Sequence, residues 1–372
     1  MRSFSGGEIF ALAVGCYVVM GAILVRLAPF RRWTKTSIIL HLKSRFSFKV
    51  VNVAHRGGSL IGPENTLFTF RKGIQDFGVQ LLEMDVNESH DGEVIVSHDA
   101  SLQRVCALEL SHLEVRDLIV AKEPSKNLPQ VCRRVKLHFP SREVGYYDAD
   151  RCAYEIPVNG ETRFPLLREV FDAFPGVPIH LDIKYPSRTL TENVVELVEE
   201  YKRESITIIG SAGGNSDSLK EILRTPTSRS KTSGATQHCS LLQAPRRSRF
   251  LKFASMKEVV VTYALFYLGL LPLVQLDFDV FSIPLPTTSK VEMLRQGTKS
   301  CMLPLLAKFL LHSPTLWVHL QRRGVLVLGF VLNDIDEFEE AVKWPVNGIM
   351  TDDPGALQAF LNTHDTSLMY TW

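Results

Sequence analysis

The chain has 372 residues, of which 45% are hydrophobic and 22% are charged. This balance is typical of a folded globular protein and excludes a disordered, collagen-like or polytopic membrane protein. The 42 basic and 40 acidic residues leave a net charge of +2, so no overall field favours nucleic acid as a partner, and nothing in the composition predicts a protein partner. Six scattered cysteines lack the spacing of a zinc site and neither require nor exclude disulfides.

The first expected element is an apolar stretch over residues 9–25, which carries no charge. Its 17 residues lie at the short end of the roughly 17 to 25 that a membrane-spanning helix needs. A cleaved signal peptide is the alternative, but only Arg2 precedes the stretch, and a basic cluster that includes Arg26 and Arg31 follows it. We therefore expect residues 1–35 to be a single-pass membrane anchor with a basic flank. The basic flank favours the cytosolic side for the rest of the chain. The expected membrane is that of the endoplasmic reticulum or another internal membrane.

Strand and helix patterns alternate over residues 48–364. Short apolar runs predict strands over residues 50–54, 81–86, 178–184, 206–209, 325–332 and 348–351. Apolar residues at helical spacing predict helices over residues 65–77, 334–344 and 354–361, and a further helix with Thr191 as its N-cap. Repeated units of this size favour an α/β fold with a parallel sheet, either closed into a barrel or open and doubly wound.

Three segments interrupt this alternation. Residues 100–164, after the second predicted strand, lack periodicity and are expected to form a small insertion. Residues 225–255 predict a mobile basic loop, for which a solvated insertion is a better explanation than a patch for anionic lipid. Residues 259–276 are uncharged and long enough for a second span, but a span there would put the strands before and after it on opposite sides of a membrane. We expect instead an apolar segment that faces the membrane, or a buried barrel helix.

Three acidic residues lie on predicted strands, where side chains alternate between the two faces of the sheet. Glu83 and Asp85 therefore share a face, as do Asp182 and Lys184. For Glu83 and Asp85 alone, a solvated strand end or a salt bridge is the commoner explanation. Three carboxylates that converge would suit Mg²⁺ or Ca²⁺, because these cations prefer hard oxygen ligands.

Two histidines and an arginine follow apolar runs. His55 and His98 each end an apolar run, which places both at one rim of a parallel sheet. Cleavage of a phosphodiester needs a base for the attacking hydroxyl and an acid for the leaving oxygen, and two imidazoles can divide these tasks near neutral pH. Arg56 could neutralise a phosphate together with Lys184. A single histidine is more often structural, so the prediction depends on the combination.

Six segments occur in a fixed order: His55-Arg56-Gly57, Pro63-Glu64-Asn65-Thr66, Glu83-x-Asp85, Asp91-Gly92, His98-Asp99-x-x-Leu102-x-Arg104 and Thr351-Asp352-Asp353-Pro354. Their order and spacing resemble those of the glycerophosphodiester phosphodiesterase family over about residues 50–361. The resemblance implies a TIM (β/α)₈ barrel with a small insertion after its second strand. It also implies the site: metal ligands Glu83, Asp85 and Asp182, an acid/base pair His55 and His98, and phosphate ligands Arg56 and Lys184.

The apolar N-terminus and residues 267–272 (YLGLLP) are similar to the membrane-bound branch of this family, whose members act as lysophospholipase D. The resemblance implies a lysophospholipid substrate, with lysophosphatidic acid and an alcohol such as choline or ethanolamine as products. Two alternatives stay open. One is hydrolysis of soluble glycerophosphodiesters to glycerol 3-phosphate, and the other is a catalytically silent membrane scaffold that binds lipid headgroups.

Two positions depart from the family pattern. Asp182 stands where Glu is more usual and is one methylene shorter, which predicts a shifted metal or one held through water. Phe330 stands where a Trp commonly precedes the segment that ends at Asn333. We expect Phe330 and Asn333 to contact the substrate, with stacking that differs from that of a Trp.

Overall fold

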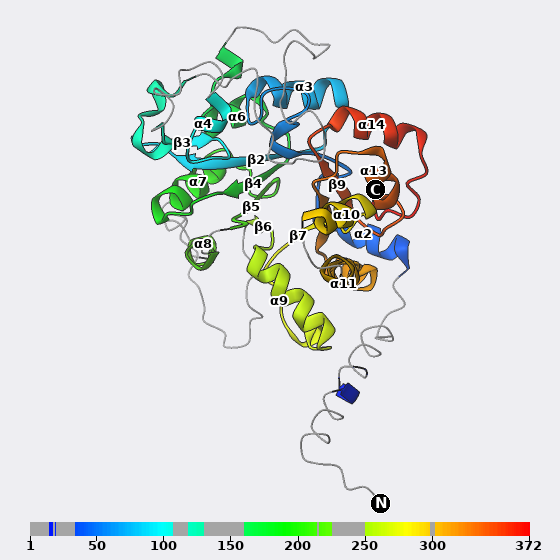
Figure 1. Ribbon diagram of the computed structural model, residues 1–372. Coiled ribbons are helices and arrows are strands. Elements are labelled where there is room, and N and C mark those ends of the chain that lie inside the picture. The colour runs from blue at the N-terminus through cyan, green and yellow to red at the C-terminus, as the bar shows by residue number, and fades with distance from the viewer. Residues whose placement is uncertain are drawn as a thin grey trace, which may run out of the picture.

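The computed structural model describes residues 15–17, 19, 34–106, 118–129, 160–213, 216–224, 250–297 and 302–372 (Figure 1). Its strands are β1 Asn52–Ala54, β2 Leu81–Glu88, β3 Val94–Val96, β4 Ile179–Ile183, β5 Thr207–Gly210, β6 Leu251–Lys252, β7 Val280–Pro284, β8 Leu326–Phe330 and β9 Gly348–Thr351. Its α-helices are α2 Lys35–Arg45, α3 Leu67–Phe77, α4 Gln103–Cys106, α6 Leu167–Ala173, α7 Arg188–Glu200, α8 Ser216–Arg224, α9 Met256–Tyr267, α10 Thr288–Gly297, α11 Met302–Leu311, α12 Pro314–Arg322, α13 Ile335–Ala341 and α14 Pro354–Thr363. Its 3-10 helices are η1 His55–Gly57, η2 Val120–Lys122, η3 Ser125–Asn127, η5 Gly160–Thr162 and η7 Leu271–Leu273.

Eight parallel strands form a nearly closed barrel in the described part of the chain. They neighbour one another in the order β6-β5-β4-β2-β1-β9-β8-β7, and β3 pairs with β2 in the antiparallel direction outside this path. The two end strands meet at one parallel bridge, between Phe253 and Val280. The sheet is therefore a barrel rather than an open doubly wound sheet, which confirms the expected fold class.

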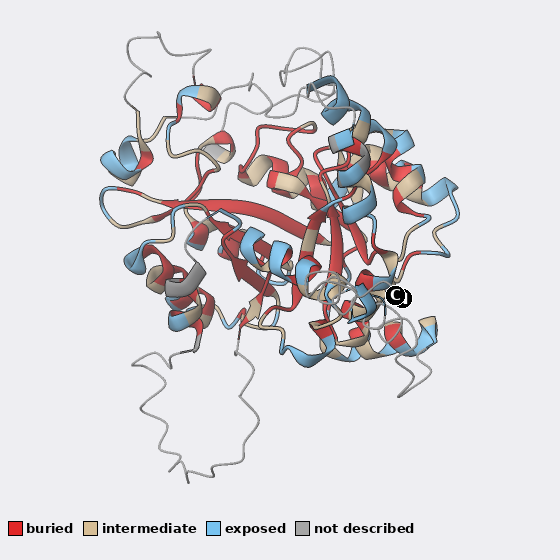
Figure 2. Cartoon of the chain, turned by 60° about the horizontal axis from the view of Figure 1, so that its bottom comes forward, coloured by how far each residue is buried: buried red, intermediate tan, exposed pale blue. Residues whose placement is uncertain are grey.

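The helix α2 closes the end of the barrel at which the strands begin. Ile38 and Leu42 of α2 are fully buried in one cluster with Val53, Leu81 and Leu326, which lie at or next to the first residues of their strands. Figure 2 shows that the strands are buried along their length, whereas the surrounding helices also present exposed faces. Five predicted site residues come after the last residue of a strand, so they lie at the end opposite α2: His55, Arg56, His98, Lys184 and Asn333. Glu83, Asp85, Asp182 and Phe330 lie within strands.

One predicted helix boundary is wrong. The helix α7 begins at Arg188, three residues before the predicted N-cap, Thr191. The hydroxyl oxygen of Ser187 accepts the backbone N–H of Leu190 at 2.9 Å and is the N-cap. Thr191 is buried inside the helix and donates its hydroxyl to the carbonyl oxygen of Ser187 at 2.7 Å. The threonine satisfies its hydroxyl within the helix, which leaves the capping position to the serine.

The predicted single-pass anchor is not supported, and we correct the membrane localisation that depended on it. In the described ranges no helix is both long enough and apolar enough to cross a bilayer. The apolar helix α9 has 12 residues, which span about 18 Å at 1.5 Å per residue, against a hydrocarbon core of about 30 Å. Of the apolar stretch 9–25, residues 15–17 and 19 are described, and the rest lies outside the described residues.

The segments that interrupt the predicted alternation are described in part. Residues 225–249 of the expected basic loop, and residues 107–117 and 130–159 of the expected insertion, lie outside the described residues. Residues 259–276 do not form one helix, because α9 ends at Tyr267 and the chain continues into η7, which contains Pro272. This break agrees with the rejection of a second span on topological grounds.

Candidate active site

A tight turn directly after β1 carries His55 and Arg56. The turn passes through left-handed backbone at Arg56 and Gly57, whose φ angles are 51° and 83°. A Cβ on Gly57 would lie 2.5 Å from the ring of Phe70, so only glycine fits there. The turn buries Arg56 and directs its backbone N–H to Oε2 of Glu83, at 2.7 Å. Left-handed backbone at a residue other than glycine costs about 1–3 kcal/mol, and the contact with Glu83 helps to hold it.

The register of β2 and β4 brings acidic residues together. Asp85 lies directly beside Asp182 in this parallel pair, and Glu83 lies two residues earlier on the same face of β2. Nζ of Lys184 contacts Oδ1 of Asp85 at 2.8 Å and Oδ2 of Asp182 at 2.6 Å. The other carboxylate oxygen of Asp182 accepts the backbone N–H of Ala212 at 3.0 Å. Lys184 thus joins two of the three predicted metal ligands.

The chemistry of these carboxylates fits a hard divalent cation such as Mg²⁺ or Ca²⁺. Oδ1 of Asp85 is buried and faces the ammonium of Lys184 at 2.8 Å. Burial, together with the charge of Asp85, raises the pKa of Glu83 to about 7, so a cation would relieve crowded negative charge. In the arrangement described, the ammonium of Lys184 supplies that positive charge. Among the described residues, no group of three or more His, Cys, Asp or Glu side chains is arranged to hold a metal. The donors therefore fit a metal by their chemistry, while their geometry is that of two carboxylates bridged by an ammonium.

His55 is oriented by Asp352, which directly follows β9. Nδ1 of His55 donates to Oδ1 of Asp352 at 2.7 Å, and its Nε2 lies 4.0 Å from Oε2 of Glu83. Asp352 also accepts the hydroxyl of Ser59 at 2.7 Å and Nδ2 of Asn333 at 2.8 Å. Burial would raise the pKa of Asp352, but His55 and these donors hold it well below its usual range. Burial likewise opposes the charged imidazole, but Asp352 outweighs it and raises the pKa of His55.

We expect Asp352→Asn to destabilise the fold most at neutral pH. The change removes the ionised acceptor of His55, so the free energy of unfolding at pH 7 should fall by about 1–3 kcal/mol. Folding lowers the pKa of Asp352, so its ionised form stabilises the fold above its unfolded pKa of about 3.9, and this contribution disappears as the pH falls toward the folded pKa. Urea unfolding at about pH 7 and about pH 3.5 should show a deficit that narrows on acidification. The exposed Glu339→Gln is the control, and equal stability of D352N and wild type at neutral pH would contradict the assignment.

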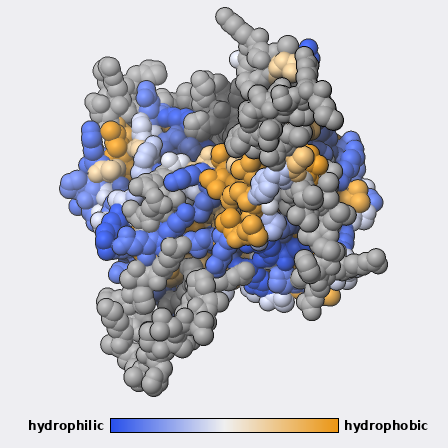
Figure 3. Space-filling model, turned by 90° about the horizontal axis from the view of Figure 1, so that it is seen from below, coloured by the Kyte–Doolittle hydropathy of each residue, from blue (hydrophilic) through white to orange (hydrophobic). Residues whose placement is uncertain are grey.

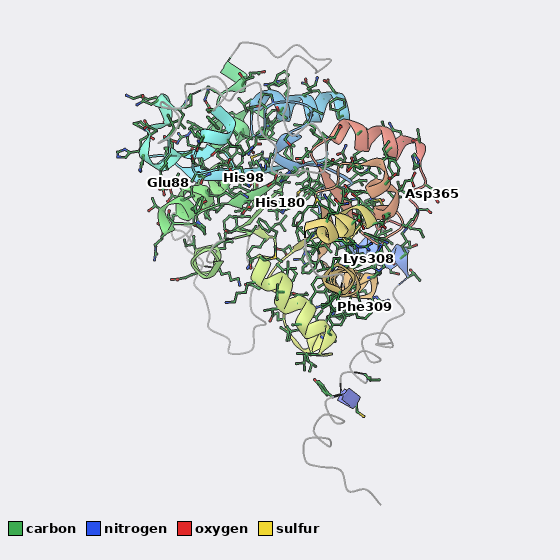
Figure 4. All side chains as sticks on the ribbon, viewed as in Figure 1. Glu88, His98, His180, Lys308, Phe309 and Asp365 are labelled. Atoms are coloured by element: carbon green, nitrogen blue, oxygen red, sulfur yellow. The ribbon has the colours of Figure 1, made fainter. Side chains whose placement is uncertain are left out.

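His98 follows β3, the strand outside the barrel path (Figure 4). Its Nδ1 donates to Oδ1 of Asp99 at 2.6 Å, and Oδ2 of Asp99 accepts Nε of Arg104 at 2.6 Å. Burial would raise the pKa of Asp99, but the hydrogen bond from His98 and the charge of Arg104 lower it. An ionised carboxylate only accepts hydrogen bonds, so Nδ1 of His98 carries a proton and any proton transfer to substrate uses Nε2.

Glu64 joins the two halves of the site. Its two carboxylate oxygens accept Arg104 at 2.8 and 2.6 Å, and one of them also accepts Nη1 of Arg56 at 3.2 Å. Through Arg104 the carboxylate reaches the pair of His98 and Asp99, and through Arg56 it reaches the turn after β1. The two predicted acid/base histidines therefore belong to one continuous network.

The two predicted substrate contacts differ in what holds them. Phe330 is the last residue of β8 and follows Leu328 on the inner face, so it lies at the mouth of the barrel. Asn333 is buried, and its amide holds Asp352: Nδ2 donates to the carboxylate at 2.8 Å, and Oδ1 accepts the backbone N–H of Asp352 at 2.9 Å. Phe330 thus remains placed for direct contact with substrate, whereas Asn333 supports the partner of His55.

Sequence reasoning gave no role to Glu64, Asp99, Arg104 or Asp352, although all four lie in the segments quoted above. Asp352 directly follows a predicted strand, as His55 does, so the same rim argument applies to it. Glu64 and Arg104 meet across 40 residues of sequence, and Asp99 contacts His98 next to it and Arg104 five residues on, and no periodic pattern shows these contacts. By contrast, His180 shares a face with Asp182 but stacks on Phe253 with ring centroids 4.3 Å apart, and burial lowers its pKa to about 3, so its imidazole is a neutral core group (Figure 4).

Acidic, cationic and imidazole side chains gathered at the carboxyl ends of parallel strands define a barrel enzyme. The chain belongs to the glycerophosphoryl diester phosphodiesterase family, whose model matches residues 55–356. This match confirms the resemblance found in the sequence motifs and makes the chain a phosphodiesterase of that family.

Relatives match most of the chain. Lysophospholipase D GDPD1 of Rattus norvegicus is 31% identical over 88% of this chain and 91% of its own length. Lysophospholipase D GDPD3 of Mus musculus is 27% identical over 95% of this chain and 91% of its own length. A phosphodiesterase of Oleispira antarctica, solved with the product sn-glycerol-3-phosphate, is 16% identical with a TM-score of 0.51 over 87% of this chain and 99% of that one. A glycerophosphoryl diester phosphodiesterase domain from Mycobacterium tuberculosis is 17% identical with a TM-score of 0.53 over 84% and 99%. These two structures show the shared fold.

Proposed function

We propose that the chain is a lysophospholipase D, which hydrolyses lysophospholipids to lysophosphatidic acid and an alcohol such as choline or ethanolamine. Two relatives that match most of its length are named lysophospholipase D. The observation that favours a lipid over a soluble glycerophosphodiester is an exposed apolar surface on α9, η7 and α11.

The apolar surface consists of Val260, Val261, Leu268, Leu273, Leu306 and Phe309. Leu273 is 82% exposed and Phe309 is 73% exposed. The hydroxyls of Tyr263 and Tyr267 donate to carbonyl groups at the end of α11, at 2.9 and 2.6 Å, so α9 contacts the C-terminal end of α11. Figure 3 shows hydrophobic side chains gathered on the face seen from below, the side toward which α9 points in Figure 1. Exposed apolar patches of this kind mark interaction sites.

A lipid aggregate is the partner that we propose for the apolar surface. Residues 259–276 contain no charged residue, and Lys308 is the only charged residue of α11, so binding requires no acidic group to leave water or to meet anionic lipid. Figure 4 shows Phe309 on α11, apart from His98. The apolar surface would therefore hold the enzyme at the aggregate, and the headgroup would enter the mouth of the barrel separately.

His55 and His98 divide proton transfer in the proposed reaction. One imidazole takes the proton of the attacking group, which is water or the hydroxyl on the neighbouring glycerol carbon, as the new phosphorus–oxygen bond forms. Attack by the glycerol hydroxyl gives a cyclic phosphodiester, which water then opens to the lysophosphatidic acid. The other gives a proton to the alcohol oxygen as its bond to phosphorus breaks. Asp352 and Asp99 accept Nδ1–H of the two rings, so each ring presents Nε2 for this exchange.

Cationic side chains and a divalent cation are proposed to hold the phosphate. Burial lowers the pKa of Lys184, but Asp85 and Asp182 outweigh it and raise the pKa, so the ammonium persists as a phosphate ligand beside Arg56. We assign Glu83, Asp85 and Asp182 as ligands of Mg²⁺ or Ca²⁺. When bound, the cation would polarise a phosphoryl oxygen and offset its charge.

The purified protein should release choline at least about tenfold faster from lysophosphatidylcholine than from glycerophosphocholine, which corresponds to about 1.4 kcal/mol of added interaction with the acyl chain or aggregate. The two substrates are compared at one concentration of divalent cation. Equal turnover would reject the lipid preference in favour of soluble glycerophosphodiesters. A folded protein that binds lysolipid and turns over neither substrate would favour the silent scaffold.

The same assay tests the apolar surface through the double variant L273Q/F309Q. We expect turnover of aggregated lysophosphatidylcholine to fall by about tenfold, because two exposed apolar side chains no longer enter the lipid, each worth up to about 1.5–3 kcal/mol when fully buried. Turnover of glycerophosphocholine should stay unchanged. Ile335→Gln, which replaces an exposed apolar residue of α13, is the matched control. Equal losses on both substrates would contradict a docking role.

A further inference from the structure

The two proposed acid/base histidines are attached to the barrel in different ways. His55 follows β1 and its partner Asp352 follows β9, and these two strands are hydrogen-bonded neighbours in the barrel. The pair is therefore fixed by the sheet itself. His98 and its partner Asp99 are consecutive residues after β3, which lies outside the barrel path, so the hydrogen bond between them does not fix either one relative to the barrel.

The backbone of this segment is held to β2, because Nδ2 of Asn87 donates to the carbonyl oxygens of Ser97 and His98 at 2.8 and 3.5 Å. Arg104 adds an attachment for the side chains. Its Nε donates to Oδ2 of Asp99 at 2.6 Å, while its two terminal nitrogens donate to the two oxygens of Glu64 at 2.8 and 2.6 Å. The guanidinium is planar and rigid, so a bidentate contact on one edge fixes the direction of the remaining N–H. The position of Glu64 thereby sets the position of Asp99, and Asp99 sets the ring of His98.

Glu64 is suited to be the fixed end of this series of contacts. Its side chain is buried, and it also accepts Arg56 from the turn after β1 at 3.2 Å. The backbone nearby is anchored as well, because the N–H of Asn65 donates to the carbonyl oxygen of Arg56 and Nδ2 of Asn65 donates to Oδ2 of Asp85 at 3.0 Å. The carboxylate is thus held by the turn after β1, and its neighbour Asn65 is held by β2.

We propose that Arg104 is a positioning residue for His98 and that Glu64 is its anchor to the barrel. Arg104 acts through Asp99, fixing the tautomer and direction of the imidazole, and does not itself bind the phosphate. The inference rests on the proposed acid/base role of His98. Loss of Arg104 should therefore lower the rate of the chemical step and leave substrate binding unchanged.

A double-mutant cycle separates this role from a binding role. Arg104→Met keeps the length of the side chain and removes its charge and donors, and we expect kcat to fall by about 10²-fold with KM within about twofold. In the His98→Ala background the same replacement should cost nothing further, because there is no ring left to position. Arg168→Met, which breaks an exposed ion pair with Glu93, is the matched control and should leave both constants unchanged.

Each outcome decides the proposal. A rise in KM at constant kcat would make Arg104 a phosphate ligand and overturn it. Losses that multiply in the double variant would overturn it as well, because the two residues would then act independently. If His98→Ala alone loses nothing, the acid/base assignment itself fails, which is a different result from a failed cycle.

Nitrogen-15 spectra of the histidine rings give a readout independent of turnover. The signals that are lost in His98→Ala identify the ring of His98. In the wild type, at a pH at which this ring is neutral, they should show a single tautomer with the proton on Nδ1, as the contact with Asp99 requires. In Arg104→Met the same ring should show mixed tautomers, and Arg104→Lys, which restores the charge without the planar fork, should recover only part of the wild-type signal. An unchanged tautomer in Arg104→Met, in protein whose unfolding midpoint shows that it is folded, would overturn the proposal.

Discussion

Replacing His98 with alanine is expected to lower kcat for phosphodiester hydrolysis by about 10²- to 10⁴-fold, the range that a general acid or base contributes. The fold should persist, because the ring lies at the end of β3 rather than in the barrel core. Steady-state kinetics on lysophosphatidylcholine, together with the unfolding midpoint, measure both. His90→Ala is the matched control, since His90 is an exposed histidine in the same part of the chain.

The leaving group tells which proton transfer His98 performs. A nitrophenolate departs with little help from an acid, so a nitrophenyl phosphodiester should recover most of the loss if His98 protonates the leaving oxygen. His55→Ala should then remain slow on that substrate. Full activity of His98→Ala on lysophosphatidylcholine would remove His98 from the mechanism.

Removal of divalent cations is expected to abolish turnover, and Mg²⁺ or Ca²⁺ should restore it. Calorimetry gives a readout apart from catalysis: Glu83→Gln should weaken cation binding by more than about tenfold, because a carboxylate ligand is lost. Lys184→Met should bind the cation at least as tightly as wild type, since the ammonium no longer occupies Asp85 and Asp182.

Glu88→Gln is the control for the metal ligands. Glu88 lies on the same strand as Glu83 but on its opposite face, where it accepts the hydroxyl of Ser187 at 2.9 Å. Its replacement should leave cation binding unchanged. Turnover that persists in chelator, or cation binding that survives Glu83→Gln, would contradict the proposed ligand set.

The local sequence pattern was enough to place groups at strand ends. His55 directly follows β1, and the i, i+2 spacing of Glu83 and Asp85 gave their common face without any knowledge of the neighbouring strand. The approach of Asp85 to Asp182, by contrast, depends on β4 lying beside β2 in one particular register. No local pattern contains that information, and the family resemblance supplied it instead.

Elements with weak local patterns escaped prediction. The strand β6 is two residues long, too short for an alternation to be seen, and the inner face of β7 includes the polar Ser282. The helix α2 buries only Ile38 and Leu42, so its apolar face is narrow. Each is held by its place in the barrel rather than by its own sequence.

The partners that complete the site were equally hidden. Arg104 contacts Glu64 across 40 residues of sequence and Asp99 across five, and charge pairs at such separations leave no periodic trace. The contact between His55 and Asp352 spans 297 residues. The sequence therefore indicated the groups that we propose to react, but it did not indicate the residues that orient them.

In the described part of the chain, the barrel closes between β6 and β7 through one bridge, which joins Phe253 and Val280. Five registered residue pairs join β2 to β4, whereas β6 pairs two residues with β5 and reaches β7 only through the bridge of Phe253, so resistance to local opening is unequal around the circumference. Asp85 and Asp182 lie on β2 and β4, the pair of strands with five registered residue pairs. Local opening between β6 and β7 would therefore leave the register that places Asp85 beside Asp182 unchanged.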